Sequence, residues 1–198
     1  MKVRAFDIIL RLPPAITKLV ARLNGKLETP PAGFRFDETH LPHITLVQQF
    51  SPVDAIRAMS NDIRAIVAHT LPLRLTTGLL TTGEITSTLT VHRTATLDTL
   101  HRQLMNQLAP FDVVIGDKYM FDDVGNDEPA RDRDVTWVTR FRTDAAYDAF
   151  DPHITLGVGK IDSAVREITF DVSEIELCVL GRFCTCRRIV ESWSLDKS

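Results

Sequence analysis

A five-residue stretch that occurs twice constrains this chain more than any other feature. The letters PHITL stand at residues 42–46 and again at 152–156, one copy in each half of the 198-residue sequence. In a chain of ordinary composition, such a repeat arises by chance on the order of once in a hundred sequences. We interpret it as the trace of an internal duplication, which predicts a protein built from two similar halves.

Each copy has the properties of a β-strand with proline at its start, because the letters that follow are short, apolar and β-branched. Successive strand side chains point to opposite faces of a sheet. His43 and Thr45 therefore share one face, and Ile44 and Leu46 share the other. The second copy repeats this arrangement. If the two halves face each other, two imidazoles and two hydroxyls converge on one cleft.

Such a set of side chains suits phosphodiester chemistry. Histidine has an ordinary pKa of about 6.5, so two of them can act as a base and an acid on opposite sides of a phosphorus atom. The hydroxyls of Thr45 and Thr155 can hydrogen-bond the non-bridging oxygens and hold the group in line. A single H-x-T in a half-buried strand is more often structural, but its presence in both copies favours catalysis by His43 and His153.

Paired H-x-T motifs, one per half of a chain of this length, resemble the two-histidine (2H) phosphoesterase superfamily, which includes bacterial 2'-5' RNA ligase-like proteins and cyclic phosphodiesterases. The resemblance implies a metal-independent enzyme that hydrolyses 2',3'-cyclic phosphates of nucleotides or RNA ends. It implies catalysis by His43 and His153, with Thr45 and Thr155 binding the phosphate. Many relatives carry a basic residue soon after the second motif, whereas Gly157-Val158-Gly159 stand there in this chain.

Three other interpretations stay open at this point. The same acid and base, run in reverse, could join RNA ends, which would be 2'-5' RNA ligase activity. A non-catalytic module could bind a nucleotide or an RNA end without turnover. A metal site could use His40, His43 and His153, although metal sites need further ligands and no motif supplies them.

Composition narrows the class of partner and the compartment. Apolar residues make up 44% of the chain and charged residues 25%, which is typical of a soluble globular protein. The net charge of -3 does not suggest a long RNA, but it is compatible with a cyclic nucleotide or a short RNA end. Residues 1–10 resemble neither a signal peptide nor a membrane span. We expect a monomer that needs no cofactor, metal or membrane.

The cysteines lie late in the chain, at 178, 184 and 186. Their odd number and the lack of C-x-x-C spacing predict reduced thiols in a cytoplasmic protein. Two aromatic residues, Phe34 and Phe36, stand in a loop over residues 24–39 that is rich in proline and glycine. They could stack on a base, although packing is the commoner role of such residues.

Periodicity predicts the order of the elements. Helices are expected from Pro13-Pro14 to 24, from Ser51-Pro52 to near His69, and over 96–108, with His101 solvated on the last of these. An acidic loop or lid around a short hairpin is expected over 110–134. The predicted strands are 3–10, 42–48, 71–80, 86–93, 135–142, 152–158, 168–180 and 186–195.

This order predicts an α+β fold of two pseudo-symmetric lobes, with antiparallel sheets lining a central cleft and helices on the outside. We expect residues 1–198 to form a single bilobal domain. The lobes, each with one H-x-T motif, would cover about 42–109 and 135–195.

Overall fold

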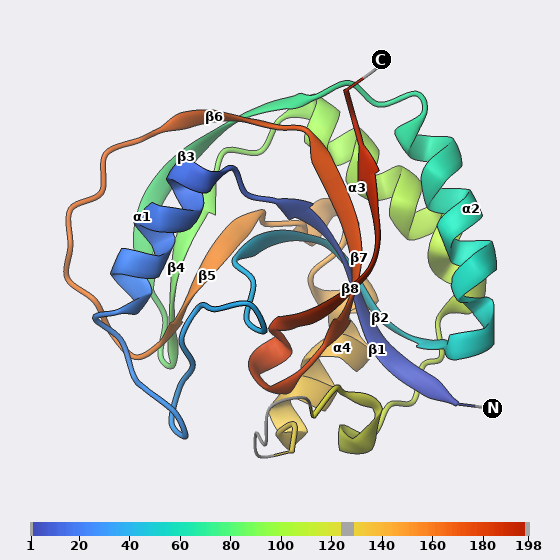
Figure 1. The fold of residues 1–198 in the computed structure, drawn as a ribbon, viewed down its shortest axis with the longest axis horizontal. Coiled ribbons are helices and arrows are strands. Elements are labelled where there is room, and N and C mark those ends of the chain that lie inside the picture. The colour runs from blue at the N-terminus through green and yellow to red at the C-terminus, as the bar shows by residue number, and fades with distance from the viewer. Residues whose placement is uncertain (1, 124–128, 197–198) are drawn as a thin grey trace.

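The computed structural model describes residues 2–123 and 129–196. It contains two antiparallel sheets of four strands each, with strand orders β2-β1-β7-β8 and β5-β4-β3-β6. Figure 1 shows how these elements are arranged. The α+β fold with two antiparallel sheets is therefore confirmed. The strands are β1 Val3–Arg11, β2 His43–Pro52, β3 Leu73–Thr82, β4 Thr86–Val91, β5 His153–Val158, β6 Thr169–Val172, β7 Glu174–Leu180 and β8 Cys186–Ser194.

Four helices lie around the sheets (Figure 1): α1 Pro14–Asn24, α2 Ile56–Val67, α3 Ala95–Leu108 and α4 Asp132–Asp144. Helices α2 and α3 pack against each other, and α4 packs against β2. The predicted helix after Pro13-Pro14 is confirmed and begins at Pro14. The helix predicted over 96–108 is also confirmed, and the Thr94 hydroxyl caps it by accepting a hydrogen bond from the Leu97 N–H. None of the described helices has the length and apolar content needed to cross a bilayer.

Each sheet carries one PHITL strand at its edge, but each sheet also combines strands from both halves of the chain. Strands β1 and β2 join β7 and β8, while β3 and β4 join β5 and β6. The sheets therefore do not follow the sequence ranges 42–109 and 135–195. The repeat is visible instead in the equivalent edge positions of β2 and β5.

The register around the two motif strands repeats closely. In the first sheet Thr45 pairs with Ile9, the register then shifts, and Val47 pairs with Ile8. In the second sheet Thr155 pairs with Thr88, the register shifts at the same place, and Gly157 pairs with Ser87. Both strands thus have an irregularity one residue after H-x-T. The two motifs are therefore equivalent in backbone pairing as well as in sequence.

The apolar members of both motifs lie in the main hydrophobic core. Ile44, Leu46, Ile154 and Leu156 are each 0% exposed, as the strand alternation predicts. Burying a side chain of this size contributes about 1.5–3 kcal/mol relative to leaving it exposed. This burial fixes the opposite faces of β2 and β5, where the polar members of the motifs lie.

The strand predicted over 135–142 is wrong, because these residues belong to α4. Their alternation also fits a helix, in which Asp134, Val138 and Phe141 form the buried side at helical spacing. Asp134 fixes the start of α4 by accepting a hydrogen bond from the backbone N–H of Arg131 at 2.9 Å.

The helix predicted to begin at Ser51-Pro52 begins later. Ser51 pairs with Arg4 in the sheet, and its hydroxyl accepts a hydrogen bond from the Gln49 side chain at 2.8 Å instead of capping a helix. Strand β2 runs to Pro52, and a 3-10 turn at Val53–Ala55 precedes α2. The side chain of Ser51 is 0% exposed, so sheet pairing and burial outweigh its preference for a cap.

The strand predicted over 168–180 is two strands in different sheets. Strand β6 pairs with β3, and after Ser173 strand β7 pairs with β1. The acidic segment forms 3-10 turns at Ala109–Phe111 and Lys118–Met120, with no hairpin among its described residues. Part of that predicted loop or lid, residues 124–128, lies outside the described residues.

The expectation of reduced thiols is wrong for two of the three cysteines. Cys178 on β7 and Cys186 on β8 form a disulfide with their Cα atoms 5.8 Å apart, and Cys184 has a free thiol. The two strands of a hairpin bring the cysteines together, which the sequence spacing alone does not reveal.

Candidate active site

A cavity of about 540 Å³ is lined by the polar residues of both motif strands. His43 and Thr45 reach it from β2, and His153 and Thr155 reach it from β5. The four residues predicted from the sequence therefore meet at one cavity. Its volume lies within the roughly 300–1,000 Å³ of small-molecule sites.

Both histidine rings are held in the same way by the chain just before them. Nδ1 of His43 lies 2.7 Å from the Leu41 carbonyl, and Nδ1 of His153 lies 2.8 Å from the Asp151 carbonyl. A carbonyl only accepts hydrogen bonds, so Nδ1 carries a proton in both rings. The nitrogen left for chemistry is Nε2 in each case.

The Nε2 atom of His43 lies 3.5 Å from Oδ2 of Asp7, a residue in the middle of β1. The Asp7 side chain is 0% exposed and that of His43 is 13% exposed. Oδ2 also accepts hydrogen bonds from the Thr45 hydroxyl at 2.9 Å and from the Gln48 amide at 2.6 Å. Within the described residues, Oδ1 of Asp7 has no hydrogen-bond partner.

These contacts shift the pKa values of both members of the pair. Burial raises the pKa of Asp7, and the opposing effects of His43, Gln48 and Thr45 do not cancel it. Burial alone would lower the pKa of His43, but the hydrogen bond and charge of Asp7, with the Leu41 carbonyl, raise it above its ordinary value. One buried carboxylate thus favours a protonated imidazole next to it.

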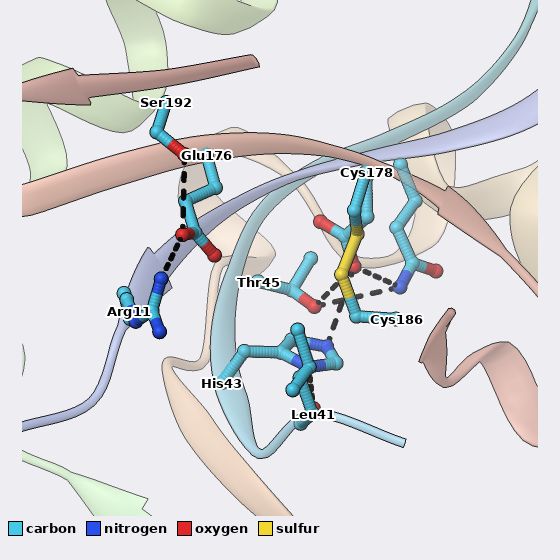
Figure 2. Close-up of a disulfide and its surroundings, with 10 residues drawn as sticks. Arg11, Leu41, His43, Thr45, Glu176, Cys178, Cys186 and Ser192 are labelled. Carbon is cyan, nitrogen blue, oxygen red and sulfur yellow. Dashed lines mark hydrogen bonds and ion pairs between the residues drawn. A yellow bond between two sulfur atoms is a disulfide. The ribbon is translucent and has the colours of Figure 1, made fainter. Parts of the chain in front are cut away.

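The Cys178–Cys186 disulfide lies beside this network, as Figure 2 shows for His43 and Thr45. The Cys186 carbonyl accepts a hydrogen bond from the Leu41 N–H at 3.1 Å, and the Leu41 carbonyl accepts one from His43. The β7–β8 hairpin therefore positions Leu41, and Leu41 orients the His43 ring.

The surroundings of the second motif differ. Among the described residues no carboxylate pairs with His153, and no protein group hydrogen-bonds the Thr155 hydroxyl. The Thr155 hydroxyl is thus available to a ligand, whereas the single hydroxyl proton of Thr45 is donated to Asp7.

Aromatic and basic residues form other parts of the cavity wall. Phe34 is buried and packs on Phe36 with ring centroids 5.5 Å apart, so packing is its role, while Phe36 is only partly buried. Trp137 on α4 is 44% exposed, which is unusual for so large an apolar side chain. Arg133, one helical turn earlier, is exposed and has no ion-pair partner among the described residues.

Three of the other histidines have interaction partners of their own. His40 interacts with Asp37 at 3.0 Å and with Arg187, and no three potential metal ligands of the described residues cluster together. His92 is half-exposed and pairs with Glu167 at 3.1 Å, and it lies outside the cavity lining. His101 is 0% exposed, so the prediction that it is solvated is wrong.

The sequence interpretation missed Asp7 and Gln48. Asp7 lies among apolar residues in the strand predicted over 3–10, and an aspartate is rarely buried unless it has partners. That anomaly was the available signal. Naming its partner would have required the pairing of β1 with β2, in which Asp7 lies opposite Gln48.

Comparison with solved structures supports the fold. The E. coli LigT structure complexed with 3'-AMP is 17% identical, has a TM-score of 0.60, and the match covers 98% of this chain and 99% of that one. The E. coli LigT structure complexed with NADP+ is 16% identical, with a TM-score of 0.59 and coverage of 98% and 99%. The protein TT0787 of Thermus thermophilus is 15% identical, with a TM-score of 0.55 and coverage of 96% and 97%. At such identities the likeness establishes the fold alone.

No curated protein sequence matches this chain significantly. A family profile described as the 2'-5' RNA ligase superfamily matches residues 12–181, a range that includes both PHITL motifs. Because that match spans most of the sequence, and because the fold agrees with LigT, the chain belongs to the 2'-5' RNA ligase superfamily of 2H phosphoesterases.

Proposed function

We propose that this protein is a metal-independent phosphodiesterase that hydrolyses 2',3'-cyclic phosphates of nucleotides or short RNA ends. The observation that supports it best is that His43 and His153, from different sheets, line one cavity with Nε2 as the available nitrogen in both. A base and an acid on opposite sides of a phosphorus atom are what in-line displacement requires.

In the proposed reaction a water molecule attacks phosphorus while the bond to one ribose oxygen breaks. One imidazole accepts a proton from the water, and the other donates a proton to the departing ribose oxygen. The hydroxyl of Thr155 donates to a non-bridging oxygen of the phosphate. Thr45 contributes in the same way once its hydroxyl turns from Asp7 toward the substrate.

The cavity wall supports a nucleotide as the substrate. The exposed face of Trp137 and the partly buried Phe36 offer surfaces on which a base can stack. The chain lacks a basic residue directly after the second motif, and Arg133 in the cavity lining offers a cation to a further phosphate. E. coli LigT has been crystallised with 3'-AMP and with ATP, which agrees with nucleotide binding in this superfamily.

The experiment is an assay of 2',3'-cyclic nucleotides in the presence of EDTA, with the products resolved as 2'- or 3'-monophosphates. His43→Ala and His153→Ala should each reduce turnover by about 10²–10⁴, the range for general acid–base catalysis. His92→Ala is the matched control, because this histidine is half-exposed and lies outside the cavity lining.

Full turnover in the double variant His43→Ala/His153→Ala would refute the proposal. Tight binding of a cyclic nucleotide without product would favour the non-catalytic module. Joining of RNA ends that carry a 2',3'-cyclic phosphate and a 5'-hydroxyl would favour 2'-5' ligation as the activity.

A further inference from the structure

We infer that Asn24 is a positioning residue that ties the aromatic wall of the cavity, at Phe36, to the second motif strand and thereby sets the affinity for the base of the substrate. The inference rests on the proposed function, because it names the residue that holds a base-binding surface of that same site. The part of the chain concerned is residues 24–41, which we call the strap.

The strap connects the second motif strand to the first motif, and it runs from the end of α1 to the start of β2 (Figure 1). Near its start, the Glu28 N–H donates to the Val158 carbonyl of β5 at 2.9 Å. Near its end, Leu41 forms a β-bridge with Cys186, and the chain then enters β2 at His43. One continuous segment therefore covers the edge of β5 that faces away from β4 and leads directly into the first motif strand.

Asn24 fixes the strap through both donors and the acceptor of its side chain. Its Nδ2 donates to the Leu156 carbonyl of β5 at 2.8 Å and to the Phe34 carbonyl at 3.0 Å. Its Oδ1 accepts a hydrogen bond from the Phe36 N–H at 3.2 Å. The two carbonyls only accept and the backbone N–H only donates, so the set requires a carboxamide. Asn24 is 1% exposed, so bulk water does not replace these bonds.

Two glycines that follow the second motif leave room for the strap. Gly157 has a φ of +148°, and a Cβ there would lie 2.9 Å from Nδ2 of Asn24 and 3.1 Å from the Leu27 side chain. Gly159 has a φ of +105°, and a Cβ there would lie 3.3 Å from the Glu28 side chain. Side chains rarely adopt such φ values, whereas glycine does so at little cost. The two glycines therefore allow the strap to pack closely against β5.

The strap carries the aromatic wall of the cavity. Phe34 and Phe36 both line the cavity, and the buried Phe34 ring lies 5.5 Å from the rings of both Phe36 and Phe183. Phe36 is only partly buried, so its ring is the part of this wall that a base can reach. Among the described residues, the bond to Asn24 is the only hydrogen bond of Phe36. Asn24 thus determines where this ring lies relative to β5.

Loss of Asn24 should disturb this wall more than the phosphate-binding side of the cavity. Thr155 lies on β5, and β4 holds the other edge of that strand through the pairing of Thr155 with Thr88. That pairing does not involve Asn24. The Phe36 backbone, in contrast, loses its hydrogen bond and its link to β5. The structure therefore predicts weaker binding of the base, with the chemistry at phosphorus largely retained.

The first test measures binding without turnover, so it separates this inference from the proposed function. Calorimetric titration gives the Kd for 3'-AMP and for ribose 3-phosphate, which lacks the base. Phe36→Ala should raise the Kd for 3'-AMP roughly fivefold to a hundredfold, and Asn24→Ala roughly fivefold to fiftyfold, through lost base stacking. The Kd for ribose 3-phosphate should change by about twofold or less in both variants. A wild-type protein that binds 3'-AMP no more tightly than ribose 3-phosphate would overturn the inference.

The double variant Asn24→Ala/Phe36→Ala distinguishes positioning from general destabilisation. If Asn24 acts through the Phe36 ring, the double variant binds 3'-AMP within about twofold of Phe36→Ala alone. Losses that multiply in the double variant would show independent effects and refute the inference.

Gln49→Ala is the matched control for Asn24→Ala. Gln49 is a buried carboxamide that also donates two hydrogen bonds and accepts one, and it lies outside the cavity lining. Its replacement should leave the ratio of the two Kd values unchanged. A change in that ratio equal to that of Asn24→Ala would contradict a specific role for Asn24.

Gly157→Ala tests the same contact from the opposite side and does not depend on the folding of Asn24→Ala. The added methyl group displaces the Asn24 amide, so the Kd for 3'-AMP should rise relative to that for ribose 3-phosphate. In turnover of 2',3'-cyclic AMP, Asn24→Ala should raise KM and keep kcat within about threefold of wild type, as expected for lost ground-state binding. An unchanged Kd ratio in Gly157→Ala, or a fall in kcat with an unchanged KM in Asn24→Ala, would contradict the inference.

Discussion

Replacing His101 by phenylalanine tests how the second motif is held in place. His101 lies on α3, where Nδ1 donates to the Leu46 carbonyl at 2.7 Å and Nε2 accepts the Tyr147 N–H at 2.8 Å. Its ring stacks on Phe150 with the centroids 3.9 Å apart. One buried side chain thereby connects the core side of β2 to the segment that leads into His153.

The expected loss of stability follows from the two backbone groups that the substitution leaves without partners, the Leu46 carbonyl and the Tyr147 N–H. Each buried, unsatisfied group costs about 1–3 kcal/mol. Phenylalanine keeps the aromatic packing against Phe150, so little apolar contact is lost. The free energy of unfolding should therefore fall by about 2–6 kcal/mol. His69→Phe, at an exposed position after α2, is the control and should change it by about 0.5 kcal/mol or less.

The effect should depend on pH because burial lowers the pKa of His101. A histidine that is harder to protonate when folded contributes its full stability above the unfolded pKa of about 6.5, and loses it as the pH falls below that value. Urea unfolding at pH 7.5 and at pH 5.5 measures the free energy of unfolding of wild type and variant. The difference in free energy of unfolding between wild type and His101→Phe should be smaller at pH 5.5 than at pH 7.5. An unchanged difference, or a variant as stable as wild type at pH 7.5, would refute the reasoning.

Three further predictions concern the cavity and its supports. Thr155→Val should reduce kcat by about 10²–10³, the usual loss for one transition-state donor. Thr45→Val should reduce kcat by less, because the Thr45 hydroxyl donates to Asp7, and equal losses in the two variants would contradict this. Trp137→Ala should raise KM for a cyclic nucleotide roughly fivefold to a hundredfold through lost base stacking, and an unchanged KM would place the base elsewhere. Reducing the disulfide, or replacing Cys178 by serine, should lower the free energy of unfolding by about 2.5 kcal/mol, the value expected for a loop with a sequence separation of 8. Urea unfolding with and without a thiol reductant measures this difference. The same urea midpoint in both conditions would argue that the disulfide does not stabilise the fold.

The strongest sequence patterns predicted the elements that position the site. In β2 and β5 the apolar residues alternate with histidine and threonine, and both strands form with the predicted faces. The strand prediction for residues 135–142 failed because alternation over so few residues fits a strand and a helix equally well. The start of α4 is fixed by the bond between Arg131 and Asp134, which local periodicity does not contain.

Strand pairing was the information that the sequence lacked. A single run over 168–180 gave no sign that β6 and β7 belong to different sheets. His101 was placed in solvent because it lies off the leucine stripe of α3, yet Tyr147 and Phe150 cover that side. Long-range partners of this kind determine the burial of a polar residue, and no local window includes them.

The same limitation explains why the two histidines looked equivalent. The PHITL copies have identical letters, the same strand register and the same orientation of Nδ1. The chemistry of an imidazole depends on the group that faces its other nitrogen, and that group comes from the neighbouring strand. Strand β1 supplies Asp7, whereas β4 supplies Thr86 at the equivalent position. Two copies with identical letters therefore place their histidines beside different groups, and only the pairing of the neighbouring strands reveals that difference.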